Sequence, residues 1–273
     1  MRYSLLFALM HAANPADTIN EFMQPGSRPR VIAHRGFSGV APENTMAAFQ
    51  KAIDVGADMF ELDVLLSQDG HVVVIHDETL DRTTDGEGPV AARTLSELKV
   101  LDAGSWFAAD FAGERIPTLA ETLELAKGRI LVNIEIKTEA VTDRAQGGIV
   151  DKALAIVRRL DMMDEIVISS FDPRALAQAR ELEPGVKTAS LFNERLQEGK
   201  SPEEVMADVG SNGFNLSGKQ VDASIVAACH RLERPVAVYT VNEISEMERI
   251  LDLGADAIFT DHPDRLLEVL ANR

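Results

Sequence analysis

Eight short apolar stretches, most of them followed by a helix-forming segment, are spread along this chain of 273 residues. Some are almost continuously apolar, such as Ile166–Ile168 and Val236–Val238, which suits parallel strands covered on both faces. The strand candidates are Arg30–His34, Asp58–Leu65, Ile130–Lys137, Glu165–Ser170, Lys187–Phe192, Gly213–Ser217, Val236–Val241 and Asp256–Thr260. The helix candidates are Glu43–Val55, Leu119–Lys127, Asp143–Leu160, Pro173–Leu182, Pro202–Val209, Asp222–Leu232 and Glu243–Leu253. This alternation predicts an α/β fold, the (β/α)8 TIM barrel.

A doubly wound open sheet is the alternative, but no segment matches its Gly-rich dinucleotide turn. We therefore expect one barrel domain over residues 30–273, preceded by an N-terminal extension over residues 1–29. The apolar run Leu5–Met10 resembles a short signal peptide that His11 interrupts. We predict a cytoplasmic protein, and the alternative is export if residues 1–13 act as a signal peptide. Cys229 is the only cysteine, so no intrachain disulfide can form, which fits a reducing compartment.

The formal net charge of −17 narrows the range of binding partners. Such an acidic chain disfavours broad contact with nucleic acid or with an anionic membrane surface. No apolar run is long enough to span a bilayer, so stable membrane insertion is not expected. An anionic small-molecule substrate would need a locally positive pocket. The sequence leaves the oligomeric state open.

An Asp-Gly pair interrupts the alternation after the second strand. Asp69 and Gly70 lie between two apolar runs, which is a strong signal for a two-residue hairpin loop. Continuing that register outward puts Asp63 directly opposite His76. The sequence therefore predicts that these two side chains share one site.

The segment from residue 77 to residue 117 is polar, rich in turns and too long for a simple connection. We interpret it as an excursion over the active end of the barrel, carrying Trp106 and Phe107. Two alternatives are open: the excursion contacts the substrate, or it is a covering loop with its own small hydrophobic cluster.

Carboxylates recur at the ends of two predicted strands. Glu61 and Asp63 are two residues apart and so point to the same side, whereas Phe60 and Leu62 point to the other side and can pack. An acidic pair facing a barrel interior is costly unless a cation neutralises it. Glu135 on the next strand supplies a third carboxylate. Ligation by oxygen alone predicts one divalent cation, Mg²⁺ or Ca²⁺.

Histidines and cations accompany these carboxylates. His34 and His76 each end an apolar run and are candidates for general acid and general base. Arg35 and Lys137 are placed to bind the oxygens of a phosphate. We interpret Glu43, which precedes an apolar helical segment, as part of a helix start, with a place in the site as the alternative.

These residues together resemble the glycerophosphodiester phosphodiesterase family. Each piece is weak alone, but the ordered set is specific and runs from about residue 31 to residue 266. The matching stretches are His34-Arg35-Gly36, Pro42-Glu43-Asn44-Thr45, Gly56-Ala57-Asp58, Glu61-Leu62-Asp63-Val64, Asp69-Gly70, His76-Asp77, Leu80-Asp81-Arg82-Thr83-Thr84, Ile116-Pro117-Thr118-Leu119, Glu135-Ile136-Lys137 and Thr260-Asp261-His262-Pro263-Asp264.

The resemblance implies a barrel phosphodiesterase that depends on a divalent cation and cleaves a glycerophosphodiester to glycerol 3-phosphate and an alcohol. It assigns the metal to the three carboxylates, acid–base catalysis to the two histidines, and phosphate binding to Arg35 and Lys137. Tyr239 stands where the family often has Trp, which leaves the shape of the head-group pocket open.

Three rival functions remain. The first is a phospholipase D-like or phosphoinositide-cleaving relative on the same barrel, which would need an apolar rim facing the membrane. The second is a non-catalytic binding barrel, which would be expected to lack some of the site residues. The third is an unrelated phosphosugar isomerase or aldolase, for whose phosphate cup Gly213–Asn215 and Gly254–Asp256 are weak candidates.

Overall fold

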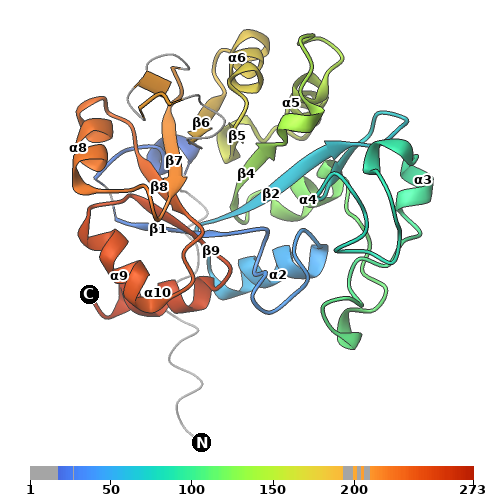
Figure 1. The fold of residues 1–273 in the computed structure, drawn as a ribbon, viewed down its shortest axis with the longest axis horizontal. Coiled ribbons are helices and arrows are strands. Elements are labelled where there is room, and N and C mark those ends of the chain that lie inside the picture. The colour runs from blue at the N-terminus through green and yellow to red at the C-terminus, as the bar shows by residue number, and fades with distance from the viewer. Residues whose placement is uncertain (1–17, 27, 193–198, 202–203, 206–209) are drawn as a thin grey trace, which may run out of the picture.

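The computed structural model describes residues 18–26, 28–192, 199–201, 204–205 and 210–273. Within these ranges, eight parallel strands close into a barrel with helices around it (Figure 1). The barrel strands are β1 (Arg30–Ala33), β2 (Met59–Leu66), β4 (Leu131–Ile136), β5 (Ile166–Ser170), β6 (Lys187–Leu191), β7 (Gly213–Ser217), β8 (Val236–Tyr239) and β9 (Ala257–Thr260). Pairing of β1 with both β2 and β9 closes the ring. The predicted (β/α)8 barrel is therefore confirmed.

Long helices cover the outside of the barrel, and short helical turns lie within the segments that connect its elements. The longer ones are α2 (Met46–Val55), α4 (Leu119–Ala126), α5 (Ile149–Leu160), α6 (Pro173–Leu182), α8 (Ala223–Arg231), α9 (Ile244–Asp252) and α10 (Pro263–Ala271). The short ones are α1 (Ile19–Phe22), α3 (Leu95–Leu98) and the 3-10 turns η2 (Val90–Ala92), η3 (Ala109–Phe111), η4 (Thr138–Ala140) and η5 (Met163–Glu165).

Two helices begin later than predicted, and one helix was not predicted. Helix α2 begins at Met46 and not at Glu43, because Asn44 has a φ of 57° and Thr45 is the N-cap. The predicted start of α5 at Asp143 is wrong, because Gly147 has a φ of 76°, which a right-handed helix cannot contain. Helix α10 was not predicted, although Pro263 at its first position is a recognised start signal. Most of the predicted helix Pro202–Val209 lies outside the described residues.

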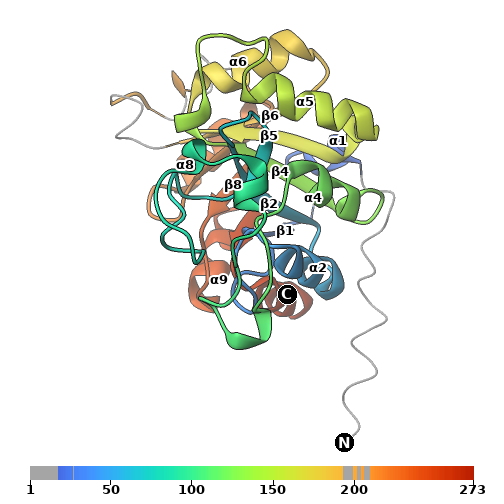
Figure 2. The same cartoon turned by 90° about the vertical axis from the view of Figure 1, so that its right-hand side faces the viewer.

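Two apolar layers hold the barrel together. Alternate strand residues such as Phe60 and Leu62 point outward and pack under the helices. Inward-pointing residues such as Ile32 and Met59 fill the end of the barrel where the strands begin. Side chains of α1, including Phe22, join this inner cluster. Figure 2 shows α1 at the end of the barrel opposite to the one toward which the β5 arrow points. The strand starts are thus closed by apolar contacts, and polar side chains gather at the strand ends.

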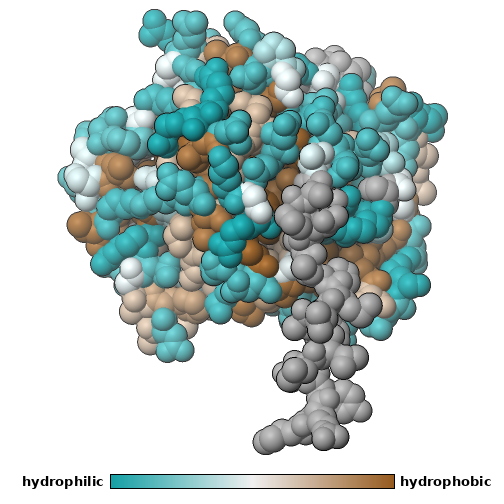
Figure 3. Space-filling view, turned by 180° about the vertical axis from the view of Figure 1, so that it is seen from behind, coloured by the Kyte–Doolittle hydropathy of each residue, from teal (hydrophilic) through white to brown (hydrophobic). Residues whose placement is uncertain are grey.

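The face of the molecule seen in Figure 3 is largely hydrophilic, and hydrophilic side chains surround smaller apolar areas there. Among the described residues, no helix has the length and apolar character needed to cross a membrane. Residues 1–13, which carry the signal-peptide alternative, lie outside the described residues, so the cytoplasmic location stays a prediction.

The hairpin after β2 forms, but its register differs from the prediction. Strand β3 (Val72–Val74) pairs with β2 so that Val64 lies opposite Val74. The backbone carbonyl of Asp63 accepts a hydrogen bond from the backbone N–H of Ile75 at 3.0 Å. The prediction that Asp63 lies directly opposite His76 is therefore wrong by one residue.

The physical reason is the length of the loop. The backbone N–H of Ser67 donates to the carbonyl of His71 at 2.9 Å, so three residues, not two, connect the strands. Gly70 adopts the left-handed conformation with a φ of 79°, as the last residue of a three-residue hairpin loop commonly does. A sequence of Asp-Gly is compatible with both loop lengths, so the pair alone could not decide the register.

The excursion from residue 77 to residue 117 has a hydrophobic cluster of its own beside the hairpin. Leu80, Val90 and Leu98 pack there against Leu65 of β2 and other buried residues. The indole N–H of Trp106 donates to a backbone carbonyl of the same loop. The excursion therefore has the small hydrophobic cluster that the covering-loop alternative expected, and substrate contact by the excursion stays a prediction.

Candidate active site

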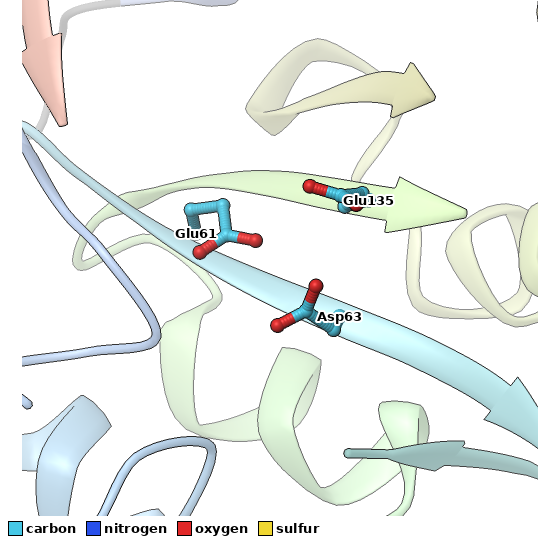
Figure 4. Close-up of side chains that lie close together, drawn as sticks. All are labelled: Glu61, Asp63 and Glu135. Carbon is cyan, nitrogen blue, oxygen red and sulfur yellow. The ribbon is translucent and has the colours of Figure 1, made fainter. Parts of the chain in front are cut away.

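Three carboxylates converge inside the barrel near the ends of two neighbouring strands (Figure 4). Glu61 and Asp63 project inward from β2, and Glu135 projects from β4, where it is paired with Asp63. Their relative exposures are 2%, 1% and 9%, respectively. Each offers one oxygen atom, and these atoms lie within 4.8 Å of one another. The strand periodicity thus produces the cluster that the sequence predicted.

The electrostatics of this cluster suit a cation. Burial and the charges of Asp63 and Glu135 raise the pKa of Glu61 well above its usual range. Burial, together with the charge of Asp63, raises the pKa of Glu135 to about 7. Oxygen Oε1 of Glu61 is buried without a hydrogen-bond partner among the described residues. Three crowded carboxylates with an unsatisfied oxygen are the donor set that Mg²⁺ or Ca²⁺ prefers, so the residues present fit a divalent cation.

Arg35 and Lys137 surround the cluster with positive charge. Nε of Arg35 lies 3.4 Å from Oδ2 of Asp63, and Nζ of Lys137 lies 3.4 Å from Oδ1 of the same residue. Lys137 also donates to Oε1 of Glu135 at 3.2 Å. Although burial acts to raise it, these two cations hold the pKa of Asp63 well below its usual range. Both predicted phosphate-binding residues are therefore at the carboxylate cluster.

In the turn after β1, both the backbone and the side chain of Arg35 contact the carboxylate cluster. Arg35 has a φ of 54°, which is uncommon for a residue other than glycine. In this conformation its backbone N–H donates to Oε2 of Glu61 at 2.9 Å. Gly36 follows with a φ of 80°, and a side chain there would collide with the backbone of Ala48 in α2. Gly36 therefore permits a tight turn at the barrel mouth.

Each predicted catalytic histidine is held by an aspartate. Nδ1 of His34 donates to Oδ1 of Asp261 at 2.7 Å, and Nδ1 of His76 donates to Oδ1 of Asp77 at 2.6 Å. Using Nδ1 in this way leaves Nε2 of each ring for a reacting group. Burial lowers the pKa of His76, while the nearby charge of Asp63 opposes that shift. His76 and Asp63 thus share the site as predicted, although their strand register was wrong.

The sequence reasoning missed several residues that organise these groups. Asp261 also accepts hydrogen bonds from Oγ of Ser38 at 2.9 Å and from Nδ2 of Asn242 at 2.7 Å. The side chain of Asn44 donates to Oδ2 of Asp63 at 2.9 Å. Glu43 accepts from Nη1 of Arg35 at 2.7 Å, so it takes part in the site and is not only part of a helix start. The one signal for Asp261 and Asn44 was their presence in stretches that match the family.

Tyr239 lies near the cluster, and its ring contacts the ring of Phe171. Its hydroxyl donates to the backbone carbonyl of Phe192 at 2.6 Å, and the two rings meet edge to face. Burial, with a contribution from the charge of Glu135, raises the pKa of Tyr239 above its usual range. The two rings therefore form an aromatic wall at the strand ends.

Comparison with known proteins connects this site to a family. The model of the glycerophosphoryl diester phosphodiesterase family matches residues 34–265, which include every residue of the site described above. The chain belongs to this family. It is therefore an enzyme, a hydrolase of phosphoric diesters, as the resemblance implied.

Individual relatives support the assignment over most of the chain. A glycerophosphodiester phosphodiesterase of Caldanaerobacter subterraneus subsp. tengcongensis is 41% identical over 241 residues, covering 88% of this chain and 97% of that protein. A solved glycerophosphodiester phosphodiesterase of Agrobacterium tumefaciens is 35% identical with a TM-score of 0.76, covering 88% of this chain and 99% of the other. A phosphodiesterase of Oleispira antarctica, solved with the product sn-glycerol-3-phosphate, is 32% identical with a TM-score of 0.80 and covers 89% and 97%.

Proposed function

We propose that this chain cleaves glycerophosphodiesters to glycerol 3-phosphate and an alcohol, with His34 and His76 as its acid–base pair. The observation that carries the proposal is that two imidazoles, each hydrogen-bonded to an aspartate through Nδ1, accompany the cluster of three carboxylates. His34 directly precedes Arg35, whose backbone N–H donates to Glu61, and the charge of Asp63 acts on His76. A relative in Oleispira antarctica was solved with the product sn-glycerol-3-phosphate, which supports this substrate class.

The phosphate of the substrate is the group that the positive charges recognise. Arg35 and Lys137 are mostly buried at the cluster and stay charged, because neighbouring carboxylates raise the pKa of each against the effect of burial. A planar guanidinium can bind two phosphate oxygens at once, whereas an ammonium acts as a point charge. These two residues would orient the diester and balance the charge that develops on its oxygens.

Glu61, Asp63 and Glu135 would hold one divalent cation, Mg²⁺ or Ca²⁺. When bound, such a cation supplies Lewis-acid polarisation of a phosphoryl oxygen. The three buried carboxylates would then remain ionised together, which their mutual repulsion otherwise opposes.

The histidines would move the protons of the reaction. One imidazole takes the proton of the attacking hydroxyl through Nε2, and the new phosphorus–oxygen bond forms. The bond from phosphorus to the alcohol oxygen breaks, and the other imidazole, protonated, gives its proton to that oxygen. The attacking hydroxyl is the 2-hydroxyl of the substrate glycerol or a water. In the first case the histidines exchange roles when water opens the cyclic phosphate.

The test is release of glycerol 3-phosphate from glycerophosphocholine by the purified protein. We expect no turnover in EDTA and recovery of turnover when Mg²⁺ or Ca²⁺ is restored. Glu61→Gln should lose most of this activity, whereas the matched control Glu124→Gln, on the exposed side of α4, should keep it. Absence of turnover by the folded protein with either cation would contradict the proposal.

A further inference from the structure

Arg82 has no role in the reaction proposed above, yet it contacts two residues that hold site side chains. It belongs to the excursion after β3, and its side chain is 45% exposed. Nε and Nη2 donate to the two oxygens of Asp77 at 2.6 and 3.1 Å, while Nη1 and Nη2 donate to the two oxygens of Glu43 at 2.7 Å each. One guanidinium therefore makes two bidentate ion pairs, with carboxylates that come from different segments of the chain.

On each of these two carboxylates, one oxygen that Arg82 contacts also accepts a hydrogen bond from a residue of the site. Oδ1 of Asp77 accepts from Nη2 of Arg82 and from Nδ1 of His76. Oε1 of Glu43 accepts from the same Nη2 and from Nη1 of Arg35. A single nitrogen atom of Arg82 thus contacts both of the oxygen atoms that hold His76 and Arg35.

We propose that Arg82 is a positioning residue that couples the imidazole of His76 to the phosphate-binding guanidinium of Arg35. This inference rests on the function proposed above. By fixing the carboxylate of Asp77, Arg82 fixes the ring orientation and the Nδ1–H tautomer of His76. By fixing Glu43, it fixes the plane in which Arg35 meets the phosphate. The two groups then keep one relative geometry, so that the proton is transferred at the phosphate that Arg35 orients.

The geometry requires arginine at this position. Only a guanidinium offers donors in a planar fork that can serve four carboxylate oxygens at once, and lysine has a single donor centre. The excursion is also anchored by its own buried cluster, which includes Leu80, Val90 and Leu98. Because the cluster anchors the excursion and the guanidinium is half-exposed, the loss of Arg82 should appear in the rate more than in the melting temperature.

The first experiment compares Arg82→Lys with a matched control, Arg158→Lys. Arg158 in α5 is also 45% exposed and also lies near two carboxylates, those of Asp151 and Glu183. With glycerophosphocholine and saturating Mg²⁺, we expect Arg82→Lys to lower kcat by roughly 10- to 100-fold, as for other residues that orient a functional side chain by hydrogen bonds. We expect Tm to stay within a few degrees of the wild type. Arg158→Lys should leave kcat and KM unchanged.

A second experiment separates the effect that passes through Asp77 to His76 from the effect that passes through Glu43 to Arg35. Asp77→Asn should lower kcat with little change in KM, because it acts through His76. Glu43→Gln should raise KM, because it acts through Arg35, and Arg82→Lys should do both. Adding Arg82→Lys to the Asp77→Asn, Glu43→Gln double variant should have almost no further effect, since both carboxylates that Arg82 holds are then already gone.

If Arg82→Ala is used instead, the 45% exposure of the site allows guanidinium from solution to enter, and low millimolar guanidinium should restore part of kcat. Wild-type kcat and KM in Arg82→Lys would overturn the inference, as would fully additive effects in the combined variants. A wild-type protein without turnover would instead contradict the proposed function, so the two failures are distinguishable.

Discussion

The carboxylate of Asp261 accepts a hydrogen bond from Nδ1 of His34 at 2.7 Å, although 227 residues separate the two in the chain. The backbone N–H of His34 donates to the carbonyl of Thr260, so closure of the barrel between β1 and β9 places them side by side. This pair depends on the complete barrel, unlike His76 and Asp77, which are adjacent in sequence.

We predict that Asp261→Asn lowers kcat by roughly 10²- to 10⁴-fold, because an amide no longer stabilises the Nδ1–H tautomer or the protonated ring of His34. The decrease in kcat is measured with glycerophosphocholine as substrate in saturating Mg²⁺. Asp264→Asn, at an exposed position early in α10, is the control and should keep wild-type turnover. Unchanged kcat in Asp261→Asn would remove the positioning role.

Substrates with different leaving groups should show which histidine is the general acid. His34→Ala and His76→Ala should each lower kcat for glycerophosphocholine by roughly 10²- to 10⁴-fold at little cost to folding. With a p-nitrophenyl ester of glycerol phosphate, whose leaving group needs no proton, the variant that lacks the acid should recover most of its rate. Equal impairment of both variants on both substrates would contradict a division into acid and base.

The raised pKa of Glu135 predicts a pH dependence of stability when no divalent cation is bound. The pKa of Glu135 is its ordinary 4.5 in the unfolded chain and about 7 in the folded one. Between these pH values the folded state therefore binds more protons than the unfolded state. Stability relative to Glu135→Gln should therefore fall as pH rises from about 4.5 to about 7 and level off above.

Urea unfolding of both proteins in EDTA at several pH values measures this difference. Saturating Mg²⁺ or Ca²⁺ should abolish the fall in the wild type, because a bound cation favours the ionised carboxylate. Parallel stability curves for the wild type and Glu135→Gln in EDTA would show that Glu135 does not titrate as inferred.

The loop of the β2–β3 hairpin predicts a stability effect that is independent of catalysis. Gly70→Ala should destabilise the protein by about 1–2 kcal/mol, because its φ of 79° is unfavourable for any residue with a Cβ. The new methyl group would also displace Nζ of Lys152, which lies 2.6 Å from the position of that Cβ. The control is Gly185→Ala, where the Cβ meets open space. Equal urea midpoints for the two variants would argue against the three-residue loop.

Much of this protein could be predicted from the sequence because the signals are local. A strand alternates its side chains with a period of two, so Glu61 and Asp63 had to share one side while Phe60 and Leu62 took the other. Parallel strands end at the same edge of a barrel, so residues at different strand ends were expected to meet. The carboxylate cluster, the two histidines and the two cations were found in this way.

The tertiary structure decided the contacts that depend on loop geometry and on barrel closure. Asp-Gly allows two hairpin loops, and hydrogen bonds around Ser67 and Gly70 select the three-residue one, which moved the register by one residue. Neither the bond from His34 to Asp261 nor the bridge from Arg82 to Glu43 follows a local periodicity. The sequence alone therefore determined which chemical groups this protein offers, because strand alternation is local. Only the folded barrel decided which group holds which, because those partners are far apart in the chain.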